Sequence, residues 1–176
     1  MRVEFCTYEQ LADIEKNHEF DIFQSPVMYK FYTSVSNHIP LFIAVWDDDR
    51  STLLGTLLAV FLQAEKGVFK WVKRCLIIGS PPIFSNENQE QIAELLLQTL
   101  VKEIKNNTSY VEFRHLNEKH PLARIICEYD FETVPWLNVH NKISSKKQLW
   151  NSLSSSKRTQ INHSLKNGAF ITSPTS

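Results

Sequence analysis

The residues most suited to binding chemistry are three cations close to the C-terminal end of the sequence, Lys157, Arg158 and Lys166. They fall within a predicted helix, Ser155–Asn167, which Gly168 would end. Ammonium and guanidinium groups bind phosphates and carboxylates. We therefore expect these three side chains to hold an anionic substrate, although a basic helix face that meets only solvent has the same pattern.

The net charge of zero hides two parts of opposite sign. Residues 1–132 carry 13 Lys and Arg against 19 Asp and Glu, whereas residues 133–176 carry six Lys and Arg and no acid. This asymmetry predicts either a basic surface for an anionic partner or a basic segment that docks on the acidic part of the chain. The sequence leaves both interpretations open.

A second candidate pair lies on a predicted strand, Tyr110–Arg114. Glu112 and Arg114 alternate with apolar residues, so they share one face of that strand. Charges in such positions either pair within the sheet or reach into a cleft, and we favour pairing. Because Arg114 stands at the end of the strand, it is also a candidate for a binding cleft.

The sequence contains no signature of a metal centre or of a familiar catalytic loop. The three cysteines are widely spaced, and the histidines form no pair at metal-ligand spacing. No G-x-S-x-G, G-x-G-x-x-G or Walker-type loop occurs. Asp47-Asp48-Asp49 stands between two predicted strands and is typical of a hairpin turn. We expect no metal, and free thiols in a reducing compartment.

The composition, with 43% apolar residues, predicts a packed globular core. No apolar run approaches the roughly 20 residues of a membrane span. The first residues lack the basic and apolar regions of a signal peptide. We therefore expect a cytoplasmic protein without a membrane span.

The elements that would position these residues follow an α+β order. Apolar runs ended by turn residues predict strands, and apolar residues at helical spacing behind a capping residue predict helices. The predicted strands are Val3–Phe5, Pro40–Trp46, Thr52–Leu62, Phe69–Ile78, Tyr110–Arg114, Phe131–Ile143 and a first turn of strand at Ala169–Thr172. The predicted helices begin at Thr7, Ser25 and Asn88 and cover Pro121–Tyr129, Lys146–Leu153 and Ser155–Asn167.

Local signals add three expectations about these elements. We expect the Asn88 side chain to cap its helix. Gly55, inside a strand, should mark a bulge or a close approach of another element. The last two helices should bury one apolar stripe, which consists of Trp150, Leu153, Ile161 and Leu165.

Several motifs, taken in order, resemble the Fem-type transferases, which are the peptidoglycan-bridge aminoacyltransferases and their acetyltransferase-like relatives. The motifs are Phe23-Gln24-Ser25-Pro26, Gly79-Ser80-Pro81-Pro82, Tyr110-Val111-Glu112-Phe113-Arg114, Leu153–Ile161 and Lys166-Asn167-Gly168-Ala169. The resemblance spans residues 20–171 and depends on the order and spacing of the motifs. It implies two GNAT-like (acyl-CoA N-acyltransferase-like) domains, each a mixed, largely antiparallel sheet flanked by helices.

The resemblance also implies how the chain is divided and what it does. Residues 1–143 would be a GNAT-like N-terminal domain, and residues 144–176 the basic helical start of a second domain that a longer chain completes. The activity implied is transfer of an acyl or aminoacyl group to an amine of a cell-envelope precursor. The donor for the full-length protein would be acyl-CoA or aminoacyl-tRNA. Gln24 would lie near the substrate cleft, and the three cations of the last helix would bind a nucleotide-linked precursor, tRNA or CoA. Arg114 is kept as a further candidate for substrate binding because of its place at the end of its strand.

The sequence departs from the family pattern at three places. Met28 stands where relatives often have Trp, and Tyr32 stands where relatives often have a Lys that grips the anionic acceptor. The glycine loop with which ordinary GNAT enzymes bind acetyl-CoA does not follow the strand that ends at Ile78. No catalytic residue is assigned. The alternative hypothesis is a non-catalytic GNAT-like module that docks an anionic partner through its basic C-terminal helix.

Overall fold

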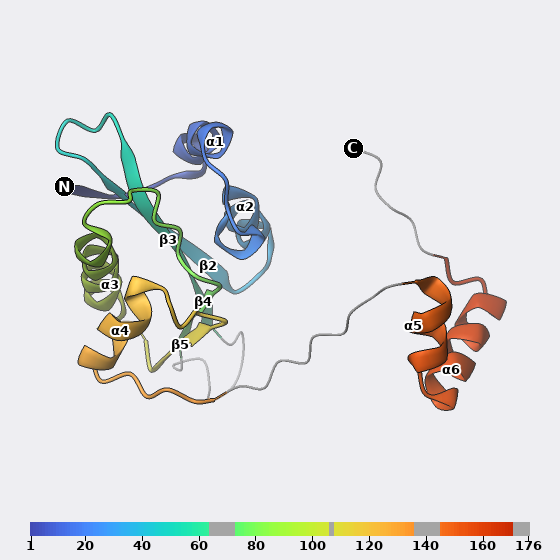
Figure 1. The fold of residues 1–176 in the computed structure, drawn as a ribbon. Coiled ribbons are helices and arrows are strands. Elements are labelled where there is room, and N and C mark those ends of the chain that lie inside the picture. Colours follow the sequence, from blue (N-terminus) through green and yellow to red (C-terminus); the bar gives the residue numbers. More distant parts are fainter. Residues whose placement is uncertain (64–72, 106–107, 136–144, 171–176) are drawn as a thin grey trace. The chain divides into compact units, whose positions relative to one another are not determined.

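The computed structural model describes residues 1–63, 73–105, 108–135 and 145–170, and the chain divides into two compact units, Met1–Thr133 and Val134–Ser176 (Figure 1). The first unit contains the strands β1 (Arg2–Phe5), β2 (His38–Trp46), β3 (Leu53–Gln63), β4 (Lys73–Ile78) and β5 (Tyr110–Arg114). Its helices are α1 (Tyr8–Asn17), the 3-10 turn η1 (Ile22–Gln24), α2 (Pro26–Ser34), α3 (Gln89–Ile104) and α4 (Pro121–Glu128). The second unit contains α5 (Lys146–Ser152) and α6 (Ser155–Lys166).

The five strands form one sheet in the order β1-β2-β3-β4-β5. The first four strands pair antiparallel, and β5 pairs parallel with β4. The parallel step is possible because α3 carries the chain from the end of β4 back to the start of β5. The predicted α+β class, with a mixed and largely antiparallel sheet, is confirmed.

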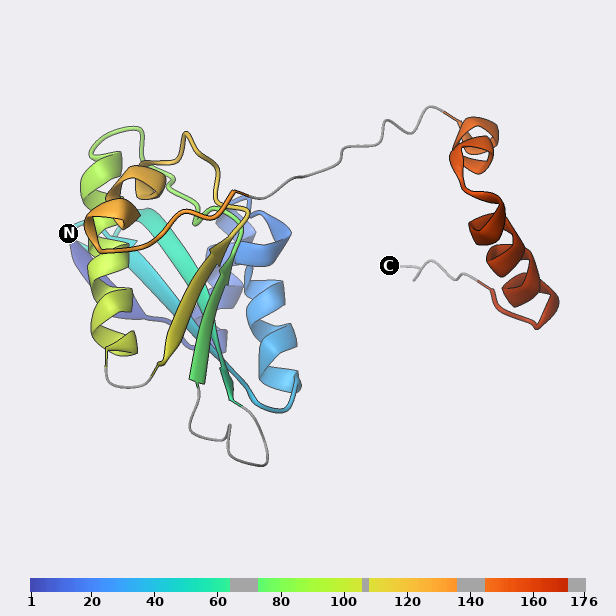
Figure 2. The ribbon, with the colours of Figure 1, turned by 90° about the horizontal axis from the view of Figure 1, so that it is seen from below.

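Helices cover both faces of this sheet (Figure 2). The apolar face of α3 packs on one side, where Ile92, Leu96 and Leu100 join Ile43, Leu57 and Ile77 in one core cluster. On the other side, Leu11 and Ile14 of α1 and Tyr32 of α2 pack against Phe42, Leu58 and Val60. Burial of these side chains from water is the main favourable term in holding the layers together.

Helix α3 buries a second face that its sequence pattern did not reveal. Ala93 and Leu97 contact Leu122 of α4, and all three side chains are buried. Leu95, beside the sheet-facing Leu96, is only partly buried against the sheet. Helix α3 therefore packs against both the sheet and α4.

Capping residues set the start of most helices where the sequence predicted. Ser25 accepts a hydrogen bond from the Met28 N–H at 3.3 Å, and Pro26 occupies the first turn of α2. The Gln10 side chain accepts the Thr7 N–H at 2.8 Å, as in a capping box. The prediction for Asn88 was wrong in its detail: Asn88 adopts a left-handed conformation with φ 55° and its side chain makes no capping hydrogen bond.

Gly55 is the point where α3 comes closest to the sheet. A Cβ atom on Gly55 would lie 2.8 Å from Ile92 Cγ2 and 3.3 Å from the Pro82 carbonyl oxygen. The register between β2 and β3 also shifts beside it, between Val45 and Trp46. Both parts of the expectation for Gly55, a close approach and a strand irregularity, are confirmed.

Three predicted strand segments differ from the structure or lie outside its described residues. Residues 131–135 form no strand, and the remainder of the predicted strand to Ile143 lies outside the described residues. Residues 69–72, predicted as the start of β4, also lie outside them. Ala169 and Phe170 follow the end of α6 without forming a strand, and residues 171–172 are outside the described part.

The second unit is a pair of short, capped helices. Ser145 accepts a hydrogen bond from the Gln148 N–H, and Ser154 accepts one from the Lys157 N–H. Gly168, with φ 85°, ends α6 as predicted. The prediction of a buried stripe was wrong, since Ile161 and Leu165 are 36% and 57% exposed and neither helix has a buried residue.

Candidate functional site

The Gln24 side chain joins two strands at the point where their main-chain pairing stops. β3 and β4 pair from Gln63–Lys73 to Val60–Leu76, and two further residues in that register would bring Leu58 opposite Ile78. At this place Gln24 Nε2 donates to the carbonyls of Leu58 (3.2 Å) and Ile78 (2.7 Å), and Gln24 Oε1 accepts the Leu58 N–H at 2.9 Å. The side-chain amide thus replaces a missing main-chain partner.

Gln24 is fully buried, and both polar atoms of its amide bind strand backbone. Its position is set by η1 and by the Ser25 cap of α2, which together turn the chain toward the sheet. The structure therefore gives Gln24 a positioning role at the end of β4. Any influence on a substrate acts through the strand ends that this amide holds.

The turn after β4 begins at Gly79, which has φ 80°. A Cβ atom there would lie 3.3 Å from Asp21 Oδ1, an atom that accepts the Phe23 N–H in η1. A positive φ together with this close neighbour explains why glycine stands at this position. The turn and η1 are consequently packed against each other at one end of the sheet.

Arg114 lies at the same end of the sheet as Gln24, on the other side of β4. Arg114 is the register partner of Ile78, whose carbonyl accepts from Gln24, and the Arg114 carbonyl accepts the Gly79 N–H at 2.8 Å. Two of the predicted site residues thus meet around the last residue of β4. This arrangement was not foreseen from the sequence.

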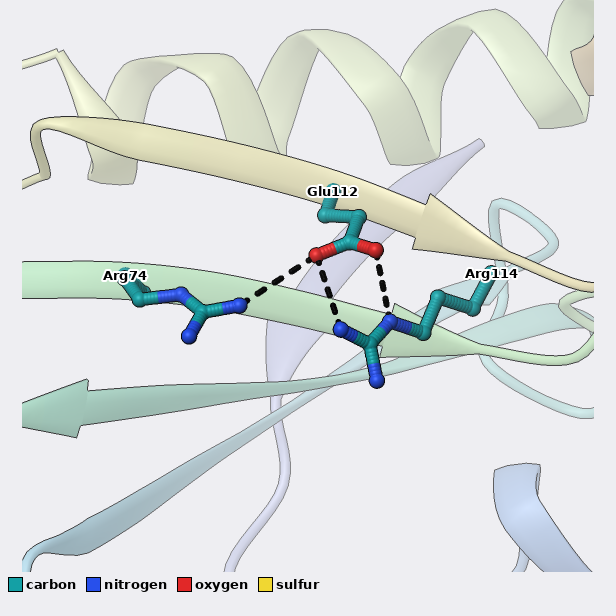
Figure 3. Close-up of polar contacts among 3 residues, drawn as sticks. All are labelled: Arg74, Glu112 and Arg114. Carbon is teal, nitrogen blue, oxygen red and sulfur yellow. Dashed lines mark hydrogen bonds and ion pairs between the residues drawn. The ribbon is translucent and has the colours of Figure 1, made fainter. Parts of the chain in front are cut away.

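The Arg114 side chain is engaged in a charge cluster with Arg74 and Glu112 (Figure 3). Arg114 Nε donates to Glu112 Oε1 at 2.6 Å, and Arg74 on β4 reaches Glu112 Oε2 at 3.4 Å. The hydrogen bond from Arg114 lowers the pKa of the Glu112 carboxyl; partial desolvation opposes this, and the charges of Arg114 and Arg74 lower the pKa further. The expected pairing of Glu112 within the sheet is confirmed.

The loop Gly79–Phe84 does not offer the open backbone N–H groups with which a helix start binds phosphate. Pro81 and Pro82 have no N–H, and the Phe84 N–H donates to the Leu54 carbonyl at 2.9 Å. The Pro82 carbonyl accepts the Thr56 N–H at 3.0 Å, and Ile83 bridges to Gly55. β4 and β5 also stay paired as far as their last residues, Ile78 and Arg114.

These observations test whether the first unit fits acyl-CoA at that loop. The loop is tied to β3 by the hydrogen bonds of Thr56 and Phe84, and two of its residues are prolines, so it offers few free backbone N–H groups. The loop residues Gly79–Phe84 therefore do not fit the pyrophosphate of a coenzyme A donor.

A histidine that sequence analysis missed connects the loops behind β4 and β5. His120 Nδ1 accepts the Leu122 N–H at 3.2 Å at the start of α4, so the neutral ring carries its proton on Nε2. Nε2 is buried and forms no well-aligned hydrogen bond among the described residues. Burial lowers the pKa of His120, and the nearby Pro81 carbonyl opposes this with a smaller upward effect. The sequence signal that could have found it is the His120-Pro121 helix start.

The remaining predicted site residues lie on α6 in the second unit. The Lys157 N–H belongs to the Ser154 cap, and Arg158 Nη1 donates to the Asn151 carbonyl at 3.4 Å. The Lys157 and Lys166 side chains are exposed and form no ion pair with any described residue. No acid occurs in residues 145–170, so this unit presents a basic surface.

Three further properties concern the described part of the chain. No group of three or more His, Cys, Asp and Glu side chains there is arranged to hold a metal ion. Asp47 accepts the Ser51 N–H at 2.8 Å within the turn that joins β2 and β3, so the acidic triplet forms the predicted hairpin turn. No described helix has the length and apolar character needed to cross a membrane.

Comparison with known proteins identifies the fold. No family model matches the sequence, and no curated protein matches it. Among solved structures, a probable acetyltransferase has a TM-score of 0.54 and 13% identity, over 83% of this chain and 100% of that one. The fold is GNAT-like. The ribosomal-protein-alanine N-acetyltransferase of Brucella melitensis has a TM-score of 0.50 and 9% identity, over 81% and 99% of the two chains.

FemX is similar over a longer part of this chain. The TM-score is 0.56 and the identity 15%, over 96% of this chain and 44% of FemX. A match of this extent includes most of residues 134–176. At these identities the comparisons describe the GNAT-like fold alone.

Proposed function

We propose that this chain is the N-terminal portion of a Fem-like acyl or aminoacyltransferase that acts on an amine of a cell-envelope precursor in the cytoplasm. In this proposal the first unit is a GNAT-like domain that positions the acceptor, and α5 and α6 begin a second GNAT-like domain. The reaction is attack of the amine on an activated acyl ester or thioester. Such an enzyme works mainly by holding two substrates in contact and stabilising the tetrahedral oxyanion.

The observation that carries the proposal is the extent of the FemX similarity. It takes in 96% of this chain but 44% of FemX, so this chain spans less than half of that protein's length. The Gly79–Phe84 loop does not fit coenzyme A, which supports the proposal that the first unit positions the acceptor and does not bind the donor. With that site unsuited to a donor in the first unit, the acyl donor, acyl-CoA or aminoacyl-tRNA, would bind elsewhere in a longer protein.

We assign the binding of an anionic substrate to three residues, Lys157, Arg158 and Lys166. A nucleotide-linked cell-wall precursor, coenzyme A and tRNA are each titrated into the chain and into its Lys157→Ala/Arg158→Ala variant by calorimetry. Loss of two charge-assisted contacts should weaken the cognate ligand by about tenfold or more. The matched control is Lys102→Ala/Lys105→Ala, because these two cations are exposed in the first unit. Equal binding by the chain and the Lys157/Arg158 variant would contradict the assignment.

The intact mass of the native protein in its source cells tests the proposal that the chain is a portion of a longer one. A mass near twice the 20.5 kDa of this chain is expected. A native mass near 20.5 kDa would favour the second candidate below.

The second candidate is a non-catalytic GNAT-like module that docks an anionic partner through α6. It is favoured by the loop after β4, which offers few backbone donors, and by the exposed cations of a unit without acids. It predicts binding to a polyanion such as heparin or tRNA that weakens steeply as salt increases. Binding that stays constant between low and moderate salt would contradict it.

A further inference from the structure

The sheet face on which α1 and α2 pack continues onto β4 and β5. Leu62 of β3 belongs to the core cluster under these two helices, and its register partner on β4 is Arg74. The register partner of Arg74 on β5 is Tyr110, and Glu112 and Arg114 follow Tyr110 at every second residue. Register partners have their side chains on the same face of a sheet, and alternate residues of a strand share a face. Both arginines, Tyr110 and Glu112 therefore lie on the face that carries α1 and α2.

This part of the sheet face is open to solvent. The side chains of Arg74 and Arg114 are both 46% exposed, and Tyr110 is 52% exposed. Leu76, between them on β4, is partly buried and gives the face an apolar floor. A ligand in solution can therefore reach both guanidinium groups. We name this surface the β4–β5 face and define it by Arg74, Leu76, Tyr110, Glu112 and Arg114.

The two guanidinium groups converge on one oxygen atom (Figure 3). Glu112 Oε2 lies 3.2 Å from Arg114 Nη2 and 3.4 Å from Arg74 Nη2. Both cationic groups are thus within reach of a single anionic group. Arg74 is also positioned by the Tyr110 ring, whose centroid lies 5.7 Å from the guanidinium carbon.

The cluster carries two positive charges and one negative charge. Arg114 donates to Glu112 through Nε and Nη2, and Arg74 donates through Nη2 alone, over the longer distance. Each guanidinium has five N–H donors, so most donors of the pair have no acceptor among the described residues. An excess of guanidinium donors on an open face favours the binding of an oxyanion.

A phosphate group suits this cluster better than a second carboxylate. A ligand carboxylate would have the same charge as Glu112 and would compete with it for the same donors, and Glu112 is already fixed on β5 beside them. A phosphate monoester carries a charge of about −1.5 to −2 and three acceptor oxygens. It can therefore bind the donors that Glu112 leaves free, and it gains more than a carboxylate from the excess positive charge.

We propose that Arg74 and Arg114 form a binding site on the β4–β5 face for the phosphate group of a small molecule. Both guanidinium groups donate to the phosphate oxygens, and Glu112 neutralises one of the two positive charges. This inference concerns binding by the first unit alone. It does not depend on the chain being a transferase or on the cations assigned in the second unit.

The experiment observes one of the two guanidinium groups directly. In the ¹⁵N-labelled chain, the Arg114 Nε–H resonance is assigned by its loss in Arg114→Lys. The probe is pyrophosphate, which consists of phosphate groups and nothing else. Pyrophosphate should move the Arg114 resonance saturably, and the titration gives the affinity at this site. Sodium chloride at the same ionic strength should not move the resonance saturably.

Two variants of the cluster test the assignment, each with a matched control. Arg74→Gln should weaken pyrophosphate about tenfold or more, because a charge-assisted contact is lost. Glu112→Gln should tighten it by about threefold or more, because a competing carboxylate is removed while its shape is kept. Arg124 and Glu90 form an exposed ion pair at 2.6 Å between α4 and α3. Arg124→Gln and Glu90→Gln change the net charge equally and should leave the affinity unchanged.

The same titration separates this inference from the proposed function. Lys157→Ala/Arg158→Ala should bind pyrophosphate at the Arg114 resonance as the unaltered chain does, and a loss of binding there would overturn the inference. It is also overturned if pyrophosphate causes no saturable shift, if Arg74→Gln binds equally well, if Arg124→Gln weakens binding as much as Arg74→Gln, or if Glu112→Gln binds no more tightly. None of these last four results bears on the role of the second unit.

Discussion

Gln24 has the largest structural consequence of any single polar side chain in the site. Replacement by Ala leaves the Leu58 N–H and the carbonyls of Leu58 and Ile78 without this partner in a buried position. We expect Gln24→Ala to lower the free energy of unfolding by about 2–4 kcal/mol, because buried unpaired polar groups are costly. Urea denaturation measures the change. Gln98→Ala, on the outer part of α3, should change it by less than about 0.5 kcal/mol.

The isosteric variant Gln24→Glu separates hydrogen bonding from packing. A protonated carboxyl can donate to the Ile78 carbonyl and accept the Leu58 N–H, but an ionised one faces two carbonyl oxygens in a buried site. Burial raises the folded-state pKa of such a carboxyl. The free energy of unfolding of the Gln24→Glu variant should therefore increase as the pH falls. A Gln24→Glu variant that is as stable as the parent at neutral pH would contradict the interpretation of Gln24 as a strand partner.

His120 should make the stability of the chain depend on pH. Its folded-state pKa is lowered from 6.5, so the unfolded chain binds more protons in mildly acidic solution. The contribution of neutral His120 to the free energy of unfolding is then fully present above pH 6.5 and is lost as the pH falls through its folded pKa. His120→Asn retains a helix-capping residue without the titration. Urea unfolding from about pH 7.5 to about pH 5.5 should therefore show a smaller decline for the variant. Equal declines would mean that His120 is not the group responsible.

The role of Gln24 could not be predicted from the sequence for a physical reason. Its partners lie 34 and 54 residues further along the chain, on strands whose separation is not visible in any local pattern. The pairing of Glu112 with Arg114 was predictable, because alternation on a strand places both side chains on one face. A polar side chain whose hydrogen-bond partners are far away in the sequence leaves no trace in the local sequence pattern.

At the scale of elements, the contact between α3 and β3 at Gly55 is the most sensitive to a small change. A methyl group at this position meets Ile92 Cγ2 at 2.8 Å and the Pro82 carbonyl at 3.3 Å, and the second contact is with backbone that cannot move freely. We expect Gly55→Ala to lower the free energy of unfolding by about 1–3 kcal/mol through overpacking. Thermal and urea unfolding provide the measurement.

A double-mutant cycle checks that the loss comes from this contact. Ile92→Ala removes the side-chain atom that the new methyl group meets, and alone it should cost about 2–5 kcal/mol by leaving a cavity. The two losses should sum to more than the loss in Gly55→Ala/Ile92→Ala, because each substitution relieves part of the other's effect. Additive losses would assign the effect of Gly55→Ala to the Pro82 carbonyl instead.

Most elements could be predicted because their signals are local. Ser25-Pro26 begins α2 and Ser154 begins α6 through hydrogen bonds within four residues. The second buried face of α3 could not be predicted in this way, since Ala93 and Leu97 are buried only because Leu122 of α4 arrives to cover them. The left-handed Asn88 likewise belongs to the path of the loop before α3 and not to the helix itself.

At the scale of the whole molecule, the two units differ in what stabilises them. All residues of the described core lie between Cys6 and Leu122, and neither α5 nor α6 has a buried residue. The sequence predicted the basic charge of the second unit correctly because charge follows from composition. The sequence could not predict the exposure of Ile161 and Leu165. An apolar stripe shows that one face of a helix is suited to packing, but it does not show which element packs against that face.

This difference predicts how the chain behaves when it is divided. A fragment of residues 1–135 should unfold in urea with a free energy within about 0.5 kcal/mol of the full chain, because it retains the whole described core. A peptide of residues 145–170 should have little helical circular dichroism in water, since helices this short are marginal without tertiary contacts. The fragment would also lose all six Lys and Arg of residues 133–176 and keep a net charge of −6. If the fragment is markedly less stable than the full chain, the second unit contributes to the folding of the first.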